Sequence, residues 1–235
     1  MDETYTAQDH AFREDDTYAG GKYELTLRWL RTRVAAPSEM INVGCGGGLF
    51  NTMAATAGYT VRGYEPDPAA YAVAAQAATP GVVVEQLGLE QIPAQPAAVV
   101  VMHDVLEHIA DETGAVARVA ALLRPDGWGV ISVPALPSLF GYHDEQLGHH
   151  RRYTKATLRR ALEPRFDIEL LRYYGMSFIP VTAWFSRLRR TPYPTASGPS
   201  IIGKAFAVAC RAESRVPTPI GTSLIALVRP RASSQ

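Results

Sequence analysis

Cysteine is scarce in this sequence, which has only Cys45 and Cys210 among its 235 residues. No C-x-x-C pair occurs, and Cys45 lies inside a glycine-rich stretch. The cysteines therefore support neither a disulfide framework nor a zinc site. From this pattern we expect no metal centre in the protein.

Long apolar runs and an excess of one charge are also absent. No uninterrupted apolar stretch approaches the length of a membrane span. Lysine plus arginine and aspartate plus glutamate each number 23, so the formal net charge is zero, without the basic excess typical of nucleic-acid binders. Residues 1–5 are acidic and polar, unlike a secretory signal. These absences predict a cytoplasmic protein with neither a membrane nor a nucleic acid as its partner.

Hydrophobic residues, by contrast, make up 47% of the chain and charged residues 20%, which suits the core of one α/β domain. Apolar segments typical of strands alternate with segments of helical spacing, and this alternation favours a mostly parallel sheet. The expected strands cover residues 40–43, 60–64, 82–85, 97–103, 129–133, 166–174 and 223–229. The expected helices include residues 23–34, 49–57, 68–78, 111–123 and a segment that Thr154 can cap.

Residues 40–50, with the sequence MINVGCGGGLF, hold the most informative motif: an apolar strand, a glycine cluster and a helix start. Glycine permits a tight turn and the close approach of a ligand, and the N–H groups at a helix start attract polar or anionic groups. Gly44, Gly46 and Gly48 form a G-x-G-x-G pattern, but Leu49 stands where a dinucleotide fingerprint requires a glycine. By itself the pattern fits either a flexible loop or a site for a nucleoside cofactor that carries a small zwitterion.

Glu65 ends the second expected strand and favours the cofactor interpretation. An acid at this position, about 20 residues after the glycine turn, is placed to accept hydrogen bonds from ribose hydroxyls. A carboxylate can do so with both oxygens, an arrangement stronger than a neutral hydrogen bond. The alternative is a solvated carboxylate at a strand end, which the pairing with the glycine turn disfavours.

Three further segments follow in order: GYEPD at 63–67, HDVLEH at 103–108 and LRPDG at 123–127. Together with NVGCGGG at 42–48, they resemble the class I S-adenosylmethionine-dependent methyltransferases over about residues 40–134. The segments 144–153 and 219–223 are similar to a bacterial branch of small-molecule methyltransferases.

This resemblance implies a Rossmann-like, doubly wound sheet of seven mostly parallel strands. The last strand would be antiparallel, and a helical or loop insertion would follow the sixth. We expect an N-terminal helical lid (1–36), a cofactor-binding core (37–175), an insertion or cap (176–216) and the last strand with a tail (217–235). The unpatterned stretch 176–200 fits an insertion that lies over the site.

The resemblance also implies S-adenosylmethionine as the cofactor and assigns residues to it. The glycines would face its methionine portion, Glu65 its ribose, and the residues around positions 66 and 88 its adenine. The family usually has an acid at the position of Asn42, so this chain lacks a charge for the cofactor's ammonium group. Separately from the resemblance, the aromatic segment from Tyr18 to Tyr23 fits a cover over the cofactor, with Gly20-Gly21 as a hinge, although aromatic residues at such spacings are more often core. The expected cofactor-binding residues are Asn42, Gly44, Cys45, Gly46, Gly48, Glu65, Pro66, Asp67, Gly88, Leu89, His103, Asp104 and Tyr18.

Catalysis would require alignment of the acceptor with the methyl group and, for a hydroxyl acceptor, a base. Histidine titrates near working pH, and the segment from His143 to Tyr153 follows the fifth strand at the edge where α/β sites form. We predict His149 and His143 as base candidates, Asp144 as an orienting or substrate-binding carboxylate, and His103 as a second choice. The triplet 151–153 fits a structural clamp or, alternatively, a site for a carboxylate or phosphate of the substrate.

The sequence thus predicts an enzyme that methylates an O or N atom of a small metabolite, such as a natural product or a sugar- or nucleotide-type molecule. One alternative is an enzyme of the same fold that catalyses a non-methylating step such as a cyclisation. The other alternative is a cofactor-binding subunit without catalytic activity. The pattern does not identify the substrate. It also does not fix the oligomeric state, for which a homodimer is one of the options.

Overall fold

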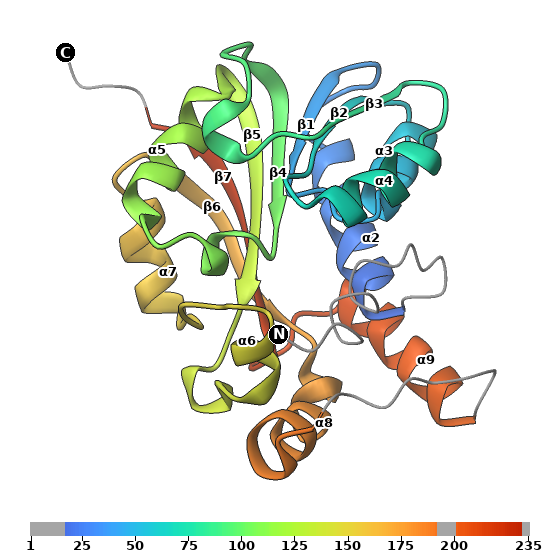
Figure 1. Ribbon diagram of the computed structural model, residues 1–235, viewed down its shortest axis with the longest axis vertical. Helices are drawn as coiled ribbons and strands as arrows, with labels where there is room; N and C mark the ends of the chain where they lie inside the picture. The colour runs from blue at the N-terminus through green and yellow to red at the C-terminus, as the bar shows by residue number, and fades with distance from the viewer. Residues whose placement is uncertain (1–16, 192–200, 232–235) are drawn as a thin grey trace.

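The centre of the molecule is a seven-stranded sheet with helices on both faces (Figure 1). The computed structural model describes residues 17–191 and 201–231. The strands are β1 (Glu39–Val43), β2 (Thr60–Tyr64), β3 (Val82–Glu85), β4 (Ala97–His103), β5 (Leu123–Pro134), β6 (Phe166–Tyr174) and β7 (Ser223–Pro230). Their order is β3-β2-β1-β4-β5-β7-β6, and only β7 runs antiparallel to its neighbours. This topology confirms the predicted doubly wound sheet with an antiparallel last strand.

The central strand β4 shows why the sheet needs cover on both sides. Val99 and Val101 face one hydrophobic cluster, whereas Val100 and Met102 face the other. Successive side chains of a strand point to opposite faces, so a strand apolar at every position must be buried on both. The sequence of this strand therefore already requires helices on each side of the sheet.

Two groups of helices supply that cover. Helices α5 (Glu112–Ala121) and α7 (Lys155–Leu162) pack on one face. Helices α2 (Thr17–Arg31), α3 (Leu49–Thr56) and α9 (Ile201–Arg215) pack on the other, and α4 (Pro68–Gln76) lies beside β3. Thr154 caps α7 as expected, since its hydroxyl accepts a hydrogen bond from the Thr157 N–H at 3.1 Å.

The fifth strand is longer than the sequence pattern indicates. Helix α5 ends at Ala121 and β5 begins at Leu123, whereas we expected a helix to 123 and a strand from 129. Leu123 pairs with Ala97 at the start of β4, and the register then shifts before Trp128 joins Val99. Pairing of β5 with β4 on both sides of residues 124–127 thus overrides the turn that their sequence predicts.

The stretch expected as an insertion is helical in its described parts. It contains η4 (Met176–Phe178), α8 (Ile179–Thr182) and the π-helix η5 (Ala183–Arg189), while residues 192–200 lie outside the described residues. Helix α9 then packs against α2. The sequence pattern did not identify α9.

The N-terminal helix α2 belongs to the core. Residues 1–16 of the expected lid lie outside the described residues, but Leu25, Leu27 and Leu30 of α2 are buried. The predicted hinge at Gly20-Gly21 is wrong, because both residues lie within α2. Gly21 allows close packing instead, since a Cβ there would collide with the Tyr174 hydroxyl.

The loops at the carboxyl ends of the parallel strands hold several short elements. These are η1 (Leu89–Gln91) after β3, η2 (Leu106–His108) after β4, and η3 (Pro137–Leu139) and α6 (Tyr142–Gln146) after β5. Binding sites of open α/β sheets form at this edge. Across the described residues, no helix has the length and apolar character needed to cross a membrane.

Candidate active site

The glycine turn after β1 is fixed to the neighbouring strand by its backbone. The N–H groups of Gly44 and Cys45 both donate to the Tyr64 carbonyl, at 2.8 and 3.0 Å, and the Gly48 N–H donates to the Cys45 carbonyl at 3.0 Å. Gly44, Gly46 and Gly48 all have positive φ, the left-handed region that favours glycine. The turn is therefore a defined structure and not a flexible loop.

Gly46 lies at the open centre of this turn. A Cβ built on Gly46 would meet no atom within 4 Å, although its φ is +53°. Gly44 differs, because a Cβ there would collide with the Val105 side chain. Packing thus requires the glycine at position 44, whereas the space beside Gly46 is available to a ligand.

The carboxylate of Glu65 faces the same turn. It accepts hydrogen bonds from the Gly46 N–H at 2.8 Å and from the Asp67 N–H at 3.0 Å, and the residue is only 7% exposed. The end of β2 and the glycine turn therefore meet, as the spacing of the two motifs predicted.

Asn42 and Cys45 have structural contacts behind the turn. The Asn42 amide donates to the Asn51 side-chain oxygen of α3 at 2.8 Å, and both residues are buried. Cys45 is a free, buried cysteine, and burial raises the pKa of its thiol to about 12. The Asn42–Asn51 contact links β1 to α3 behind the turn.

The predicted adenine-side residues lie on the far side of Glu65. Asp67 caps α4 by accepting from the Ala69 and Ala70 N–H groups at 2.9 and 2.8 Å. Pro66 is exposed, and Leu89 is 9% exposed within the core. The Gly88 N–H donates to the Gln91 side chain at 2.9 Å, and a Cβ on Gly88 would lie 4.0 Å from Pro66. Pro66 and Gly88 therefore lie side by side.

Asp104, directly after β4, forms an ion pair with the buried Lys22 that the sequence pattern did not reveal. Its carboxylate pairs with the ammonium of Lys22 from α2 and accepts a hydrogen bond from the Ser132 hydroxyl at 3.0 Å. Burial favours a higher pKa for Asp104, but Lys22 outweighs it and lowers the pKa below the usual value. Asp104 has a φ of +53°, an uncommon conformation for a residue with a side chain. A strained, charged residue at this edge is typical of functional sites.

His103 is held in the core and does not suit the role of a base. Its Nε2 lies 3.2 Å from the Thr26 hydroxyl and its Nδ1 lies 3.0 Å from the Ser132 hydroxyl. Burial, together with the positive charge of Lys22, lowers the pKa of His103 to about 3. The imidazole is therefore neutral at working pH and acts as a hydrogen-bonding link between α2 and β5.

Tyr18 also lies at this edge, on α2. Its hydroxyl lies 2.8 Å from the Thr222 hydroxyl and 2.7 Å from the Ser223 hydroxyl. Its ring packs edge-on against Phe178 and at a tilt against Tyr174. Tyr18 thus ties α2 to the start of β7 above the sheet.

A second group of charged residues surrounds Asp144 of α6. The Asp144 carboxylate, with no exposed surface, accepts from the Arg152 Nε at 2.7 Å and the Gly141 N–H at 2.9 Å, and lies 2.8 Å from the His149 Nδ1. Burial works against ionisation, but these partners outweigh it and lower the pKa of Asp144 to about 2. The predicted partnership of His149 with Asp144 is present in the structure.

The remaining histidines of this group are less suited to proton transfer. Burial and the neighbouring His149 lower the pKa of His143 to about 3, and the two rings are 6.2 Å apart. The same two causes lower the pKa of His108 to about 4. Burial raises the pKa of Glu107 well above its usual value. The sequence pattern favoured His143 and His149 as base candidates; the lowered pKa counts against His143, and the role of His149 stays a prediction.

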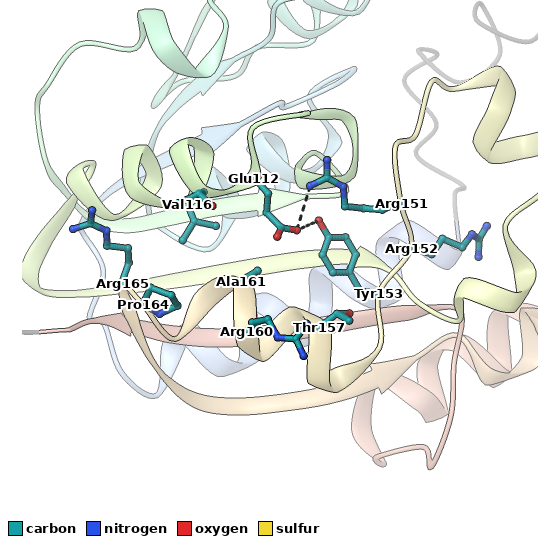
Figure 2. Close-up of a pocket in the computed structure, with 11 residues that line it drawn as sticks. Glu112, Val116, Arg151, Arg152, Tyr153, Thr157, Arg160, Ala161, Pro164 and Arg165 are labelled. Atoms are coloured by element: carbon teal, nitrogen blue, oxygen red, sulfur yellow. Dashed lines mark hydrogen bonds and ion pairs between the residues drawn. The ribbon is translucent and has the colours of Figure 1, made fainter.

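A cavity of about 430 Å³ lies between α5 and α7. Figure 2 shows Tyr153 and Glu112 pointing toward one another, with Arg151 beside them. The Tyr153 hydroxyl donates to Glu112 at 2.7 Å, and Arg151 pairs with Glu112 at 3.4 Å. These contacts fit the clamp interpretation of residues 151–153. None of the residues that line this cavity belongs to the glycine turn, so it is not the cofactor site.

The strand order and the glycine turn beside an acidic strand end define the fold of class I S-adenosylmethionine-dependent methyltransferases. Residues 17–169 match the model of a family described as a methyltransferase domain. This match spans more than half of the chain, and the chain belongs to that family.

Relatives with similar sequences and structures agree with this assignment. Ubiquinone biosynthesis O-methyltransferases of Albidiferax ferrireducens and Thiobacillus denitrificans are 31% and 34% identical over 112 and 111 residues. The aligned part is 44% of this chain and 44% and 48% of theirs, so the match spans just under half of these curated relatives.

Two solved structures share the fold. The N-methyltransferase NodS of Bradyrhizobium japonicum, in complex with S-adenosylhomocysteine, has a TM-score of 0.61 at 16% identity, covering 98% of this chain and all of that chain. The Burkholderia thailandensis 1,6-didemethyltoxoflavin-N1-methyltransferase has a TM-score of 0.59 at 16% identity, covering 93% of this chain and 80% of that chain.

Proposed function

We propose that this chain is an S-adenosylmethionine-dependent methyltransferase that transfers a methyl group to an O or N atom of a small metabolite. The observation that carries the proposal is the open space at Gly46 beside the buried Glu65 carboxylate. Relatives named for O-methylation and for N-methylation both support the reaction class, and this leaves the acceptor atom open. The cytoplasmic location, the small-molecule partner and the absence of a nucleic-acid partner remain predictions.

The turn residues fit the cofactor that the family implies. The backbone at Gly44, Gly46 and Gly48 would hold its methionine portion, and Glu65 would accept from its ribose hydroxyls. Pro66 and Gly88 would flank its adenine. When bound, the cofactor would supply an electrophilic methyl group on a sulfonium sulfur. The remaining task of the protein is to align the acceptor and exclude water.

The region from Asp104 to His149 would receive the acceptor. The Lys22–Asp104 pair provides fixed charges where β4 ends, and α2 covers this point. The contact of His149 Nδ1 with the ionised Asp144 carboxylate places the ring proton on Nδ1 and leaves the lone pair on Nε2. His149 would therefore be the histidine that takes a proton from a hydroxyl acceptor.

Calorimetric titration with S-adenosylmethionine and S-adenosylhomocysteine tests the proposal. We expect binding by the native chain and loss of binding in Gly46→Val, whose side chain would occupy the ligand space. Gly81→Val is the matched control, because Gly81 also has a positive φ and open surroundings but lies before β3, away from the turn. It should lose stability and keep binding.

Absence of heat with both ligands would contradict the proposal. Release of S-adenosylhomocysteine during turnover distinguishes methyl transfer from a non-methylating reaction and from a subunit that only binds the cofactor.

A further inference from the structure

Glu107 in η2 is a fully buried carboxylate with 0% exposure. Within the described residues, neither of its side-chain oxygens has a hydrogen-bond partner. Burying a carboxylate costs several kcal/mol, on the order of the penalties known for unpaired ions, unless a partner compensates. A buried polar group without a partner requires an explanation. One explanation is that Glu107 is a ligand of a metal cation.

Two histidines lie beside this carboxylate. His108 is the next residue, and His149 comes from the segment after α6. One potential ligand atom of each of the three side chains lies within 4.8 Å of the others, and the two imidazole rings are 4.5 Å apart. Nitrogen and oxygen ligands at about 2.0–2.1 Å from a tetrahedral zinc are about 3.4 Å from one another. Closing the gap to this spacing requires a rotation of the His108 side chain, whose residue is exposed.

The surroundings of His149 are those of a metal ligand. Its Nδ1 lies 2.8 Å from Asp144, which Arg152 and Gly141 hold in turn. Metal-binding histidines typically donate their other ring N–H to a carboxylate, which fixes the tautomer and the ring orientation. This contact leaves the Nε2 lone pair of His149 available to a cation.

We propose that Glu107, His108 and His149 bind one divalent transition-metal cation of the Zn²⁺ and Co²⁺ class. Imidazole nitrogens favour this class, whereas Mg²⁺ and Ca²⁺ prefer ligand sets made of oxygen. The cation also gives the Glu107 side chain the partner that both of its oxygens lack within the described residues. Three protein ligands leave at least one coordination position open, as in catalytic zinc sites.

Two of the proposed ligands follow directly after the segment that packs against the cofactor turn. Val105, two residues before Glu107, packs against Gly44 of the turn, and the charge of Asp104 acts on Glu107. The next step rests on the proposed function: the open coordination position accepts a hydroxyl oxygen of the methyl acceptor. A metal-bound hydroxyl loses its proton to water more easily. Its oxygen then forms the O–CH₃ bond as the S–CH₃ bond breaks, and the sulfur leaves as the uncharged thioether. With the cation bound, the His149 Nε2 is a metal ligand, and only in the chain without a cation is the same nitrogen the base proposed above.

Cobalt loading of the full chain tests the site. The purified protein is stripped with a chelator, titrated with Co²⁺ and followed by its visible absorption, with metal content measured by mass spectrometry. We expect one Co²⁺ per chain, displaceable by Zn²⁺. His108→Gln and Glu107→Gln should each weaken Co²⁺ binding by at least about tenfold. His150→Gln is the matched control, an exposed histidine of the same region outside the cluster.

The exposed position of His108 keeps the fold intact in its variant, which S-adenosylhomocysteine calorimetry verifies. Absence of stoichiometric Co²⁺, or equal binding by His108→Gln and His150→Gln, would overturn the metal site. Catechol serves as the oxygen-donor probe: a shift of the Co²⁺ spectrum on its addition supports the open position, and an unchanged spectrum overturns it. Loss of S-adenosylhomocysteine binding in the native chain would instead count against the proposed function and leave the metal result standing.

Discussion

The glycine turn and the cluster around Asp144 lie at the same edge of the sheet but are built by different means. The turn is held by backbone hydrogen bonds between neighbouring strands, with Glu65 as its single carboxylate. The Asp144 cluster is held by a buried carboxylate that joins Arg152 and His149. A backbone frame leaves open space for a ligand, whereas a network of buried charges fixes side chains and depends on each partner.

The largest expected effect comes from removal of the buried carboxylate of Asp144. Asp144→Ala leaves the Arg152 guanidinium buried without its carboxylate, while its hydrogen bond to the Ala135 carbonyl at 3.2 Å remains. Removal of one member of a buried pair costs about 3–5 kcal/mol. Urea unfolding followed by circular dichroism measures this loss.

The matched control is Asp167→Ala, which removes an exposed pair with Arg231. Exposed pairs contribute about 1 kcal/mol or less. If both variants lose equally little stability, the Asp144 network does not support this end of the sheet.

The carboxylate of the turn should affect binding more than folding. Glu65→Gln removes the charge that would accept from the ribose hydroxyls, and a charged hydrogen bond contributes about 1.5–3 kcal/mol, or about 10–100-fold in affinity. Calorimetry with S-adenosylhomocysteine measures the change. Glu85→Gln, at the exposed end of the adjacent strand β3, is the control and should bind normally. Equal affinities of the two variants would contradict the role of Glu65.

The smallest expected effect is at His103, the last residue of β4. Its pKa in the folded chain is about 3, below the ordinary value near 6.5. Between these values the unfolded chain binds a proton that the folded chain does not, so stability is lost as the pH falls below about 6.5. At about pH 5.5 the loss is about 1.2 kcal/mol relative to pH 7.

The free energy of unfolding of the native chain and of His103→Gln, compared at both pH values, isolates this contribution. Lys22 from α2 and Asp104 are the charged groups that act on His103, and both remain in the variant. The native chain should lose more stability on acidification. Parallel losses would show that His103 does not titrate between the folded and unfolded states as expected.

Much of the fold was predictable because the responsible signals are local. The strand at 97–103 and the strand at 82–85 have the predicted bounds, since their apolar runs are bounded by turns. The meeting of Gly46 with Glu65 was also predictable, because a parallel β-α-β unit brings the ends of adjacent strands together.

Other features depend on contacts between distant parts of the chain. Lys22 belongs to a helix far in sequence from Asp104, and no spacing connects them. The prediction of no metal centre was based on the cysteines. Glu107 and His149 are far apart in the sequence, so their proximity could not be predicted from it. The Gly20-Gly21 pair looked like a hinge, but packing of Gly21 against Tyr174 decides its role.

The sequence by itself determined the class of fold and the position of the cofactor turn, because glycine conformations and strand patterns act over a few residues. The tertiary structure alone decided which charged side chains are buried together at the edge of the sheet. The reason is physical: Lys22 and Asp104 meet only when α2 packs on the sheet, and the unpartnered state of Glu107 follows from its burial there. Both are properties of the assembled sheet and helices.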